Sequence, residues 1–120
     1  MTKRFCVSIT HAKDDTDRAT VGFVVANAAV ASERETMVFL SIEGVRLATD
    51  GYADDVQEAG FQPLKKLMDD FTANGGKVYV CSPCFKKRTL DENKLVPGAT
   101  IVGGAKLVEF LSEGAPSVSY

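Results

Sequence analysis

Apolar residues in this chain gather in short runs that alternate with segments in which they recur every three or four positions. The short runs are rich in β-branched and aromatic residues and predict strands at residues 4–10, 36–42, 77–80 and 100–102, with an edge strand at 117–120. The helical spacing predicts helices at 16–31, from Pro63 to a cap at Asn74, at 83–88 and at 105–113. Alternating strands and helices predict an α/β fold, with a parallel sheet and helices on both faces.

The loops after the predicted strands mark the edge of the sheet where a site is expected. In a parallel sheet the carboxyl ends of the strands share one edge, and ligands of α/β proteins bind beyond it. Four loops meet there, namely His11–Asp15, Glu43–Val45, Cys81–Cys84 and Gly103–Gly104. Candidate chemistry is therefore concentrated in these loops, and the polar segment at 49–60 is expected to be an excursion.

Length and composition limit the class of protein. The chain has 120 residues, 45% of them hydrophobic, which suits one domain over residues 1–120 with a core that needs no disulfide. The net charge of −2 argues against a broad nucleic-acid-binding face, so no direct nucleic-acid binding is expected. No apolar stretch approaches ~18 residues and no signal peptide is evident, so no membrane span is expected. Three cysteines, two of them three positions apart, favour a reducing cytoplasm.

The pair Cys81 and Cys84 is the strongest candidate for chemistry. Cys81 falls at the end of a predicted strand, and Cys84 falls in the first turn of the next helix. The free N–H groups and the dipole at a helix start stabilise a thiolate, which is the reactive form of cysteine. Lys86, Lys87 and Arg88 follow and add positive potential. We therefore expect a lowered thiol pKa, with the three basic residues as a docking or thiolate-stabilising patch.

The spacing of the pair also lets one thiol act on the other. Cys84 can resolve a disulfide, a sulfenic acid or a persulfide formed on Cys81. Pro83 suits the first helical turn and stiffens the link between them. Cys6 differs, because it lies inside the first predicted strand, and we expect it to fill the core.

Three other chemistries compete with this interpretation. A thioredoxin-type oxidoreductase has a similar motif, but that motif follows an early strand and a Trp, whereas this pair comes late and the chain has no Trp. Structural zinc needs four ligands, of which Cys81 and Cys84 supply two. Cys6 and His11 are poor candidates for the other two, so no metal and no cofactor is predicted. A zinc site shared between subunits is the remaining alternative. Phosphate binding at Gly103 and Gly104 lacks the known glycine-rich patterns, so close packing is the expected role of these glycines.

Two further edge loops supply candidate binding residues. His11, the single histidine, can carry a proton in the loop after the first strand, although loop histidines are commonly just solvated. Glu43, beside Gly44, is expected either to line the site or to hydrogen-bond its own loop.

Four stretches together resemble a known family: Phe5–Ala31, Val38–Val45, Lys77–Cys84 with its basic follow-on, and Val102–Ala105. In order and spacing they resemble the DsrE/DsrF-like proteins, which include sulfur-relay subunits of tRNA thiolation and sulfur-oxidation DsrE proteins. The resemblance implies a three-layer, flavodoxin-like sandwich with a mostly parallel sheet of about five strands, and a homo-oligomer, often a trimer or hexamer. It also implies a persulfide on Cys81. Cys84 matches a cysteine of only some branches, since sulfur-relay members have a small residue there.

These observations lead to three hypotheses about function. The first is a cytoplasmic sulfur carrier with Cys81 as acceptor, Cys84 as resolving thiol, and a sulfurtransferase or desulfurase as partner. The second is a dithiol–disulfide redox protein that uses the same pair. The third is a non-catalytic oligomeric scaffold or small-ligand-binding module. The sequence names neither donor nor acceptor, and it leaves open whether the protein is an enzyme.

Overall fold

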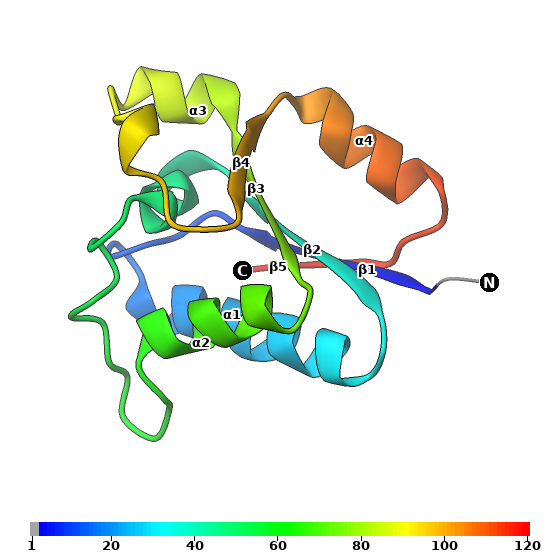
Figure 1. The fold of residues 1–120 in the computed structure, drawn as a ribbon, viewed down its shortest axis with the longest axis horizontal. Coiled ribbons are helices and arrows are strands. Elements are labelled where there is room, and N and C mark those ends of the chain that lie inside the picture. Colours follow the sequence, from blue (N-terminus) through cyan, green and yellow to red (C-terminus); the bar gives the residue numbers. More distant parts are fainter. Residues whose placement is uncertain (1–2) are drawn as a thin grey trace.

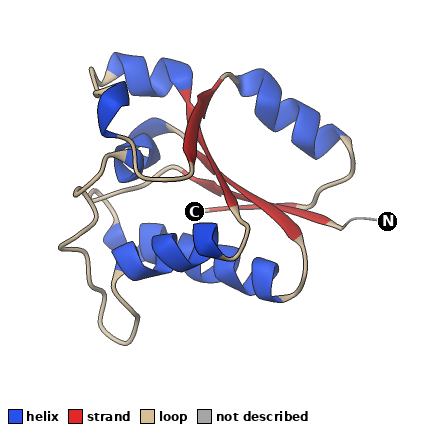
Figure 2. Ribbon diagram, viewed as in Figure 1, coloured by secondary structure: helices blue, strands red, loops and turns tan. Residues whose placement is uncertain are grey.

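Every predicted strand and helix is present in the structure, a computed structural model that describes residues 3–120. Met1 and Thr2, which the predicted domain includes, lie outside the described residues. Figure 2 shows how strands and helices alternate along the chain. The elements are β1 (Arg4–Ile9), α1 (Thr16–Ala31), β2 (Glu35–Leu40), the 3-10 helix η1 (Ile42–Ala48), α2 (Leu64–Ala73), β3 (Lys77–Cys81), α3 (Ser82–Lys87), the 3-10 turn η2 (Glu92–Lys94), β4 (Ala99–Val102), α4 (Gly104–Ser112) and β5 (Ser117–Ser119).

The five strands form one sheet in the order β4-β3-β2-β1-β5, and every pairing is parallel. The carboxyl ends of all strands therefore share one edge, as expected from the sequence. The predicted edge strand is β5, which pairs with β1. Figure 1 shows α1 and α2 together on one side of the sheet and α4 on the other, so the predicted α/β sandwich is confirmed.

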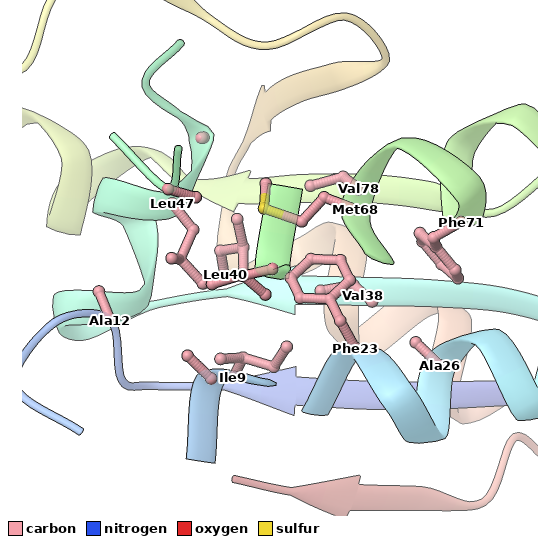
Figure 3. Close-up of a cluster of buried hydrophobic side chains, with 14 of the residues drawn as sticks. Ile9, Ala12, Phe23, Ala26, Val38, Leu40, Leu47, Met68, Phe71 and Val78 are labelled. Atoms are coloured by element: carbon pink, nitrogen blue, oxygen red, sulfur yellow. The ribbon is translucent and has the colours of Figure 1, made fainter. Parts of the chain in front are cut away.

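The face under α1 and α2 carries the larger core. Asp15 caps α1 by accepting a hydrogen bond from the Arg18 N–H at 3.1 Å, which satisfies one of the free donors of the first turn. Phe23 of α1 and Phe71 of α2 are fully buried, and their rings meet edge to face with centroids 5.9 Å apart. Figure 3 shows the Phe23 ring beside Val38 and Leu40 of β2, with Phe71 farther along the same layer. This layer packs on the central strand, β2.

The opposite face has a thinner cover. Cys6, Met37 and Phe39 form its buried cluster. From α4, Leu107, Phe110 and Leu111 pack on that cluster while remaining partly exposed. Val108, on the outer side of α4, is 63% exposed.

The second strand ends two residues earlier than the sequence pattern predicts. Ile42 is not part of β2; it has a φ of 56° and begins η1. The turn brings η1 across the end of β1, where Ser41 donates to the Ile9 carbonyl at 3.1 Å. A Cβ on Gly44 would lie 2.2 Å from that carbonyl oxygen, so only glycine fits at this crossing.

The polar excursion after η1 folds back over the loop that follows β1. The hydroxyl of Tyr52 accepts a hydrogen bond from the Lys13 N–H at 3.1 Å, and the Lys13 ammonium lies 2.9 Å from Asp55. No helix within residues 3–120 has both the length and the apolar character that a bilayer crossing requires.

Candidate functional site: the cysteine pair at the end of β3

Cys81 lies at the end of β3, as the sequence predicts, and it is also the N-cap of α3, which begins one residue earlier than predicted. Its partner in the sheet register is Val102, the last residue of β4. Cys81 is partly exposed and packs against both hydrophobic clusters, the one under α1 and α2 and the one under α4. The thiol therefore lies where the two layers of the protein meet, at the edge of the sheet.

The chain leaves β3 and β4 toward different clusters. Phe85 of α3 is buried in the larger cluster, whereas Leu107 of α4 packs on the smaller one. Adjacent strands whose connections diverge in this way open a crevice at their carboxyl ends, which is where open α/β sheets bind ligands. Cys81 lies at this point of divergence.

All three cysteines carry free thiols. Burial, followed by the neighbouring Cys84 thiol, raises the pKa of Cys81, while the Cys84 N–H and the charge of Arg88 act in the opposite direction. The expectation of a lowered thiol pKa is therefore wrong for Cys81. The Cys84 N–H and the Arg88 charge do favour the thiolate, as predicted. Burial of Cys81 where the two layers meet removes solvent from the thiol, and this effect outweighs them.

Glu43 joins the loop after β2 to α3. Its carboxylate accepts from Arg88 Nε at 2.6 Å and from Arg46 Nε at 2.9 Å. Arg88 first, and Arg46 after it, hold the pKa of the Glu43 carboxyl below its usual value. The Arg88 side chain is only 13% exposed and also donates to the Cys84 carbonyl at 3.2 Å. Glu43 is thus connected to the cysteine pair through Arg88.

The predicted basic patch is split in the structure. Arg88 turns back onto the start of α3, while Lys86 and Lys87 are exposed. The sequence-based prediction did not include Arg46 among the site residues. The i,i+3 spacing of Glu43 and Arg46, at which opposite charges pair on a helical turn, could have indicated it. Cys6 is fully buried, and burial raises the pKa of its thiol, so its expected role in the core is confirmed.

His11 belongs to a different cluster at the start of α1. Its Nδ1 lies 2.8 Å from the Asp14 carboxylate, and its Nε2 lies 3.5 Å from the Arg18 guanidinium. Because both partners come from the same loop and helix, the structure places His11 in the first edge loop and gives it local hydrogen-bond partners only. Gly44, in contrast, is a packing residue, because it allows η1 to cross the end of β1.

Gly103 and Gly104 do not pack closely, contrary to the sequence-based expectation. A Cβ on either residue would meet no other atom within 4 Å. They open α4 directly after β4, next to the end of β3, but neither backbone has a left-handed φ. Within residues 3–120, no group of three or more His, Cys, Asp or Glu side chains is arranged to hold a metal ion.

The family model described as DsrE/DsrF-like matches residues 3–118. The chain belongs to the DsrE/DsrF-like family. This membership supports a sulfur-relay type of protein at the level of the family.

Two curated relatives of this DsrE-like chain come from Methanocaldococcus jannaschii. The uncharacterized protein MJ0760 is 30% identical over 97 residues, which are 81% of this chain and 35% of that protein, so the chain spans about a third of this relative. The uncharacterized protein MJ0989 is 29% identical over 117 residues, which are 98% of this chain and 99% of the relative.

Two solved structures share the DsrE-like fold over essentially their whole length. The YchN protein of E. coli superposes with a TM-score of 0.81 at 18% identity, covering 100% of both chains. MTH1491 of Methanobacterium thermoautotrophicum, a protein of unknown function, superposes with a TM-score of 0.77 at 18% identity, covering 98% of this chain and 99% of the other. At these identities the likeness concerns the fold.

Proposed function

We propose that this DsrE-like protein carries sulfur as a persulfide on Cys81. The observation that carries the proposal is the position of Cys81, a partly exposed free thiol at the divergence of β3 and β4. A cysteine there is open to a donor on one side and held by the protein on the other. The raised pKa of Cys81 fits a thiol that is protected at rest and becomes reactive when a partner docks.

The proposed loading step transfers one sulfur atom from a persulfide donor. The Cys81 thiolate attacks the terminal sulfur of the donor R–S–SH, the donor S–S bond breaks, and R–S⁻ leaves and takes up a proton. Cys81 is then a persulfide, Cys81–S–SH. Cys84 resolves this species when its thiolate attacks the Cys81 sulfur, which forms a Cys81–Cys84 disulfide and releases HS⁻. The Cys84 thiol is near enough to raise the pKa of Cys81, and this proximity supports the route.

The test is mass spectrometry after incubation with a cysteine desulfurase and cysteine. We expect a gain of one sulfur atom on Cys81, its loss in Cys81→Ser, and its accumulation in Cys84→Ser, in which the resolving thiol is absent. A Cys6→Ser variant that still loads serves as the matched control. If Cys81 stays unmodified under conditions that load an established carrier, the proposal is wrong.

A dithiol–disulfide oxidoreductase is the second candidate, and the proximity of the two free thiols favours it. In this case the two thiols close to a disulfide without passing through a persulfide. An oxidised form without added sulfur, with a potential between those of cytosolic dithiols and glutathione, would favour this function.

The surroundings of the protein form part of the proposal. Three free thiols suit a reducing compartment, so we place it in the cytoplasm with a sulfurtransferase or desulfurase as donor. A homo-oligomer, trimer or hexamer, remains the expected assembly and is measured by light scattering. If the double variant Cys81→Ser/Cys84→Ser has no effect in the cell, a scaffold or ligand-binding role replaces both chemical functions.

A further inference from the structure

An ion pair between distant loops connects η1 to the cysteine-bearing helix. Glu43 and Arg88 are 45 positions apart in sequence, and the Glu43 carboxylate accepts from Arg88 Nε at 2.6 Å. The Arg88 side chain is 13% exposed and that of Glu43 is 33% exposed. A pair with so little exposure is screened less by solvent than the surface pairs of α2, such as Lys65–Asp69.

Each member of this ion pair has a neighbour in the chain with a left-handed backbone conformation. Ile42, directly before Glu43, has a φ of 56°, and Thr89, directly after Arg88, has a φ of 51°. Both residues are β-branched, and β-branched residues are disfavoured in left-handed backbone. Such conformations persist only where surrounding contacts impose them, and they are common at functional sites. Here they set the directions of the two chain segments that bring the carboxylate and the guanidinium together.

The charged side chains around Cys81 have different partners. Arg88 is bonded both to the Cys84 carbonyl and to Glu43, and its charge favours a Cys81 thiolate. Glu43 in turn is shared with Arg46. On the α4 side, the Lys106 ammonium lies over the Tyr79 ring, 5.3 Å from its centroid, two residues before Cys81 on the same face of β3.

We propose that Glu43 is a positioning residue that acts through Arg88: its carboxylate holds part of the Arg88 charge away from the cysteines and so keeps Cys81 a protonated thiol at rest. An anion on Cys81, thiolate or persulfide, then competes with Glu43 for the same guanidinium. The inference rests on the proposed function only in taking Cys81 as the reacting thiol.

The experiment measures the alkylation rate of Cys81 against pH in the full-length protein, with iodoacetamide as probe and tandem mass spectrometry to separate Cys81 from Cys84. We expect Glu43→Gln, which keeps an acceptor for Arg88, to speed alkylation at pH 7 by about threefold or more. Arg88→Met is expected to slow it by a similar factor. Arg46→Met, which removes the other arginine on the same carboxylate, is the matched control and is expected to change the rate less than Arg88→Met.

The double variant decides whether Glu43 acts through Arg88. We expect Glu43→Gln to have no accelerating effect once Arg88 is Met, because the two residues then form one unit. An acceleration of equal size in both backgrounds, or slower alkylation in Glu43→Gln alone, overturns the inference. Arg88→Lys, which restores the charge, is expected to recover part of the wild-type rate, and circular dichroism checks that each variant is folded.

The role of Glu43 and the sulfur-carrier function can fail independently of each other. Alkylation needs no sulfur donor, so the effect of Glu43→Gln can be found in a protein whose Cys81 never takes up sulfur. In that case the function fails and the role of Glu43 stands. If Cys81 does load but Glu43→Gln leaves its alkylation unchanged, the role of Glu43 fails and the function stands.

Discussion

One face of the sheet is covered by α1 and α2 and the other by α4. In the first layer Phe23 and Phe71 are fully buried, whereas in the second Phe110 remains partly exposed and no residue of α4 is fully buried. Burial of apolar surface is the main stabilising contribution to a fold, so the first layer holds most of the folding free energy. The cysteine pair lies where the two layers meet, at the boundary between a firmly packed and a lightly packed region. This combination gives a reactive group a fixed base and an approachable side.

The largest expected effect comes from the same substitution made in each layer. Phe23→Ala should lower the free energy of unfolding by about 3–5 kcal/mol, because it leaves a cavity in the larger core. Phe110→Ala, which removes a partly exposed ring, should cost about 1–2 kcal/mol. Urea unfolding followed by circular dichroism measures both values. Equal losses would contradict the contrast between the two layers.

A second comparison uses Gly44 and Gly104, which belong to two of the loops at the carboxyl edge of the sheet. Gly44→Ala should destabilise the protein by about 1–3 kcal/mol, because the added Cβ would meet the Ile9 carbonyl at 2.2 Å. Gly104→Ala has open space at its Cβ position and lies in the first turn of α4, so it should be neutral or stabilise by up to about 1 kcal/mol. Thermal melting of both variants tests the pair, and a costly Gly104→Ala would reveal a contact that the structure does not contain.

The light cover of α4 predicts a smaller, local effect on Cys6. Because Cys6 is fully buried beneath that helix, its alkylation requires the α4 layer to open. Phe110→Ala should therefore speed the alkylation of Cys6 by roughly fivefold, the factor that corresponds to about 1 kcal/mol. Val108→Ala, an exposed residue of the same helix, is the control and should leave the rate unchanged. If both variants behave alike, Cys6 is reached by another route.

The smallest effect concerns the ion pair at the boundary between the layers. Because Arg88 and Arg46 depress the pKa of Glu43, this carboxylate contributes stability that is fully present above its unfolded value of about 4.5 and is lost as the pH falls through the lower, folded value. Glu43→Gln should therefore be less stable than the wild type at pH 6, and the difference should shrink toward pH 3.5. Urea unfolding at the two pH values measures this change. If the difference in stability between the variant and the wild type does not depend on pH, the Glu43 ion pairs do not contribute to stability.

The sequence predicts much of the fold because its signals are local. The helix at Thr16–Ala31 follows from its apolar spacing and its Asp cap, and the position of Cys81 follows from the short run Lys77–Val80. The left-handed turn at Ile42 has no such signal, since β-branched residues are rare in that conformation. It is imposed by the packing of η1 on the end of β1, which only the folded chain contains.

The electrostatics of the site depend on contacts between distant segments. The sequence identifies Glu43, Arg88 and the two cysteines as candidates, but it cannot pair residues 45 positions apart. It also identifies the groups that lower the thiol pKa without revealing the burial that outweighs them. Likewise, the open space around Gly103 and Gly104 depends on how α4 leaves the sheet.

The short strand β5 has a consequence for the order in which the chain folds. It covers the free edge of β1, and the Thr10 hydroxyl donates to the Tyr120 carbonyl, 110 positions away. Contacts between such distant residues form late, because they require closure of nearly the whole chain. Until then β1 presents an unpaired strand edge, a template for pairing with another molecule. Once β5 has paired with β1, the edge on this side of the sheet is a strand of only three residues, which offers few free backbone groups to another molecule.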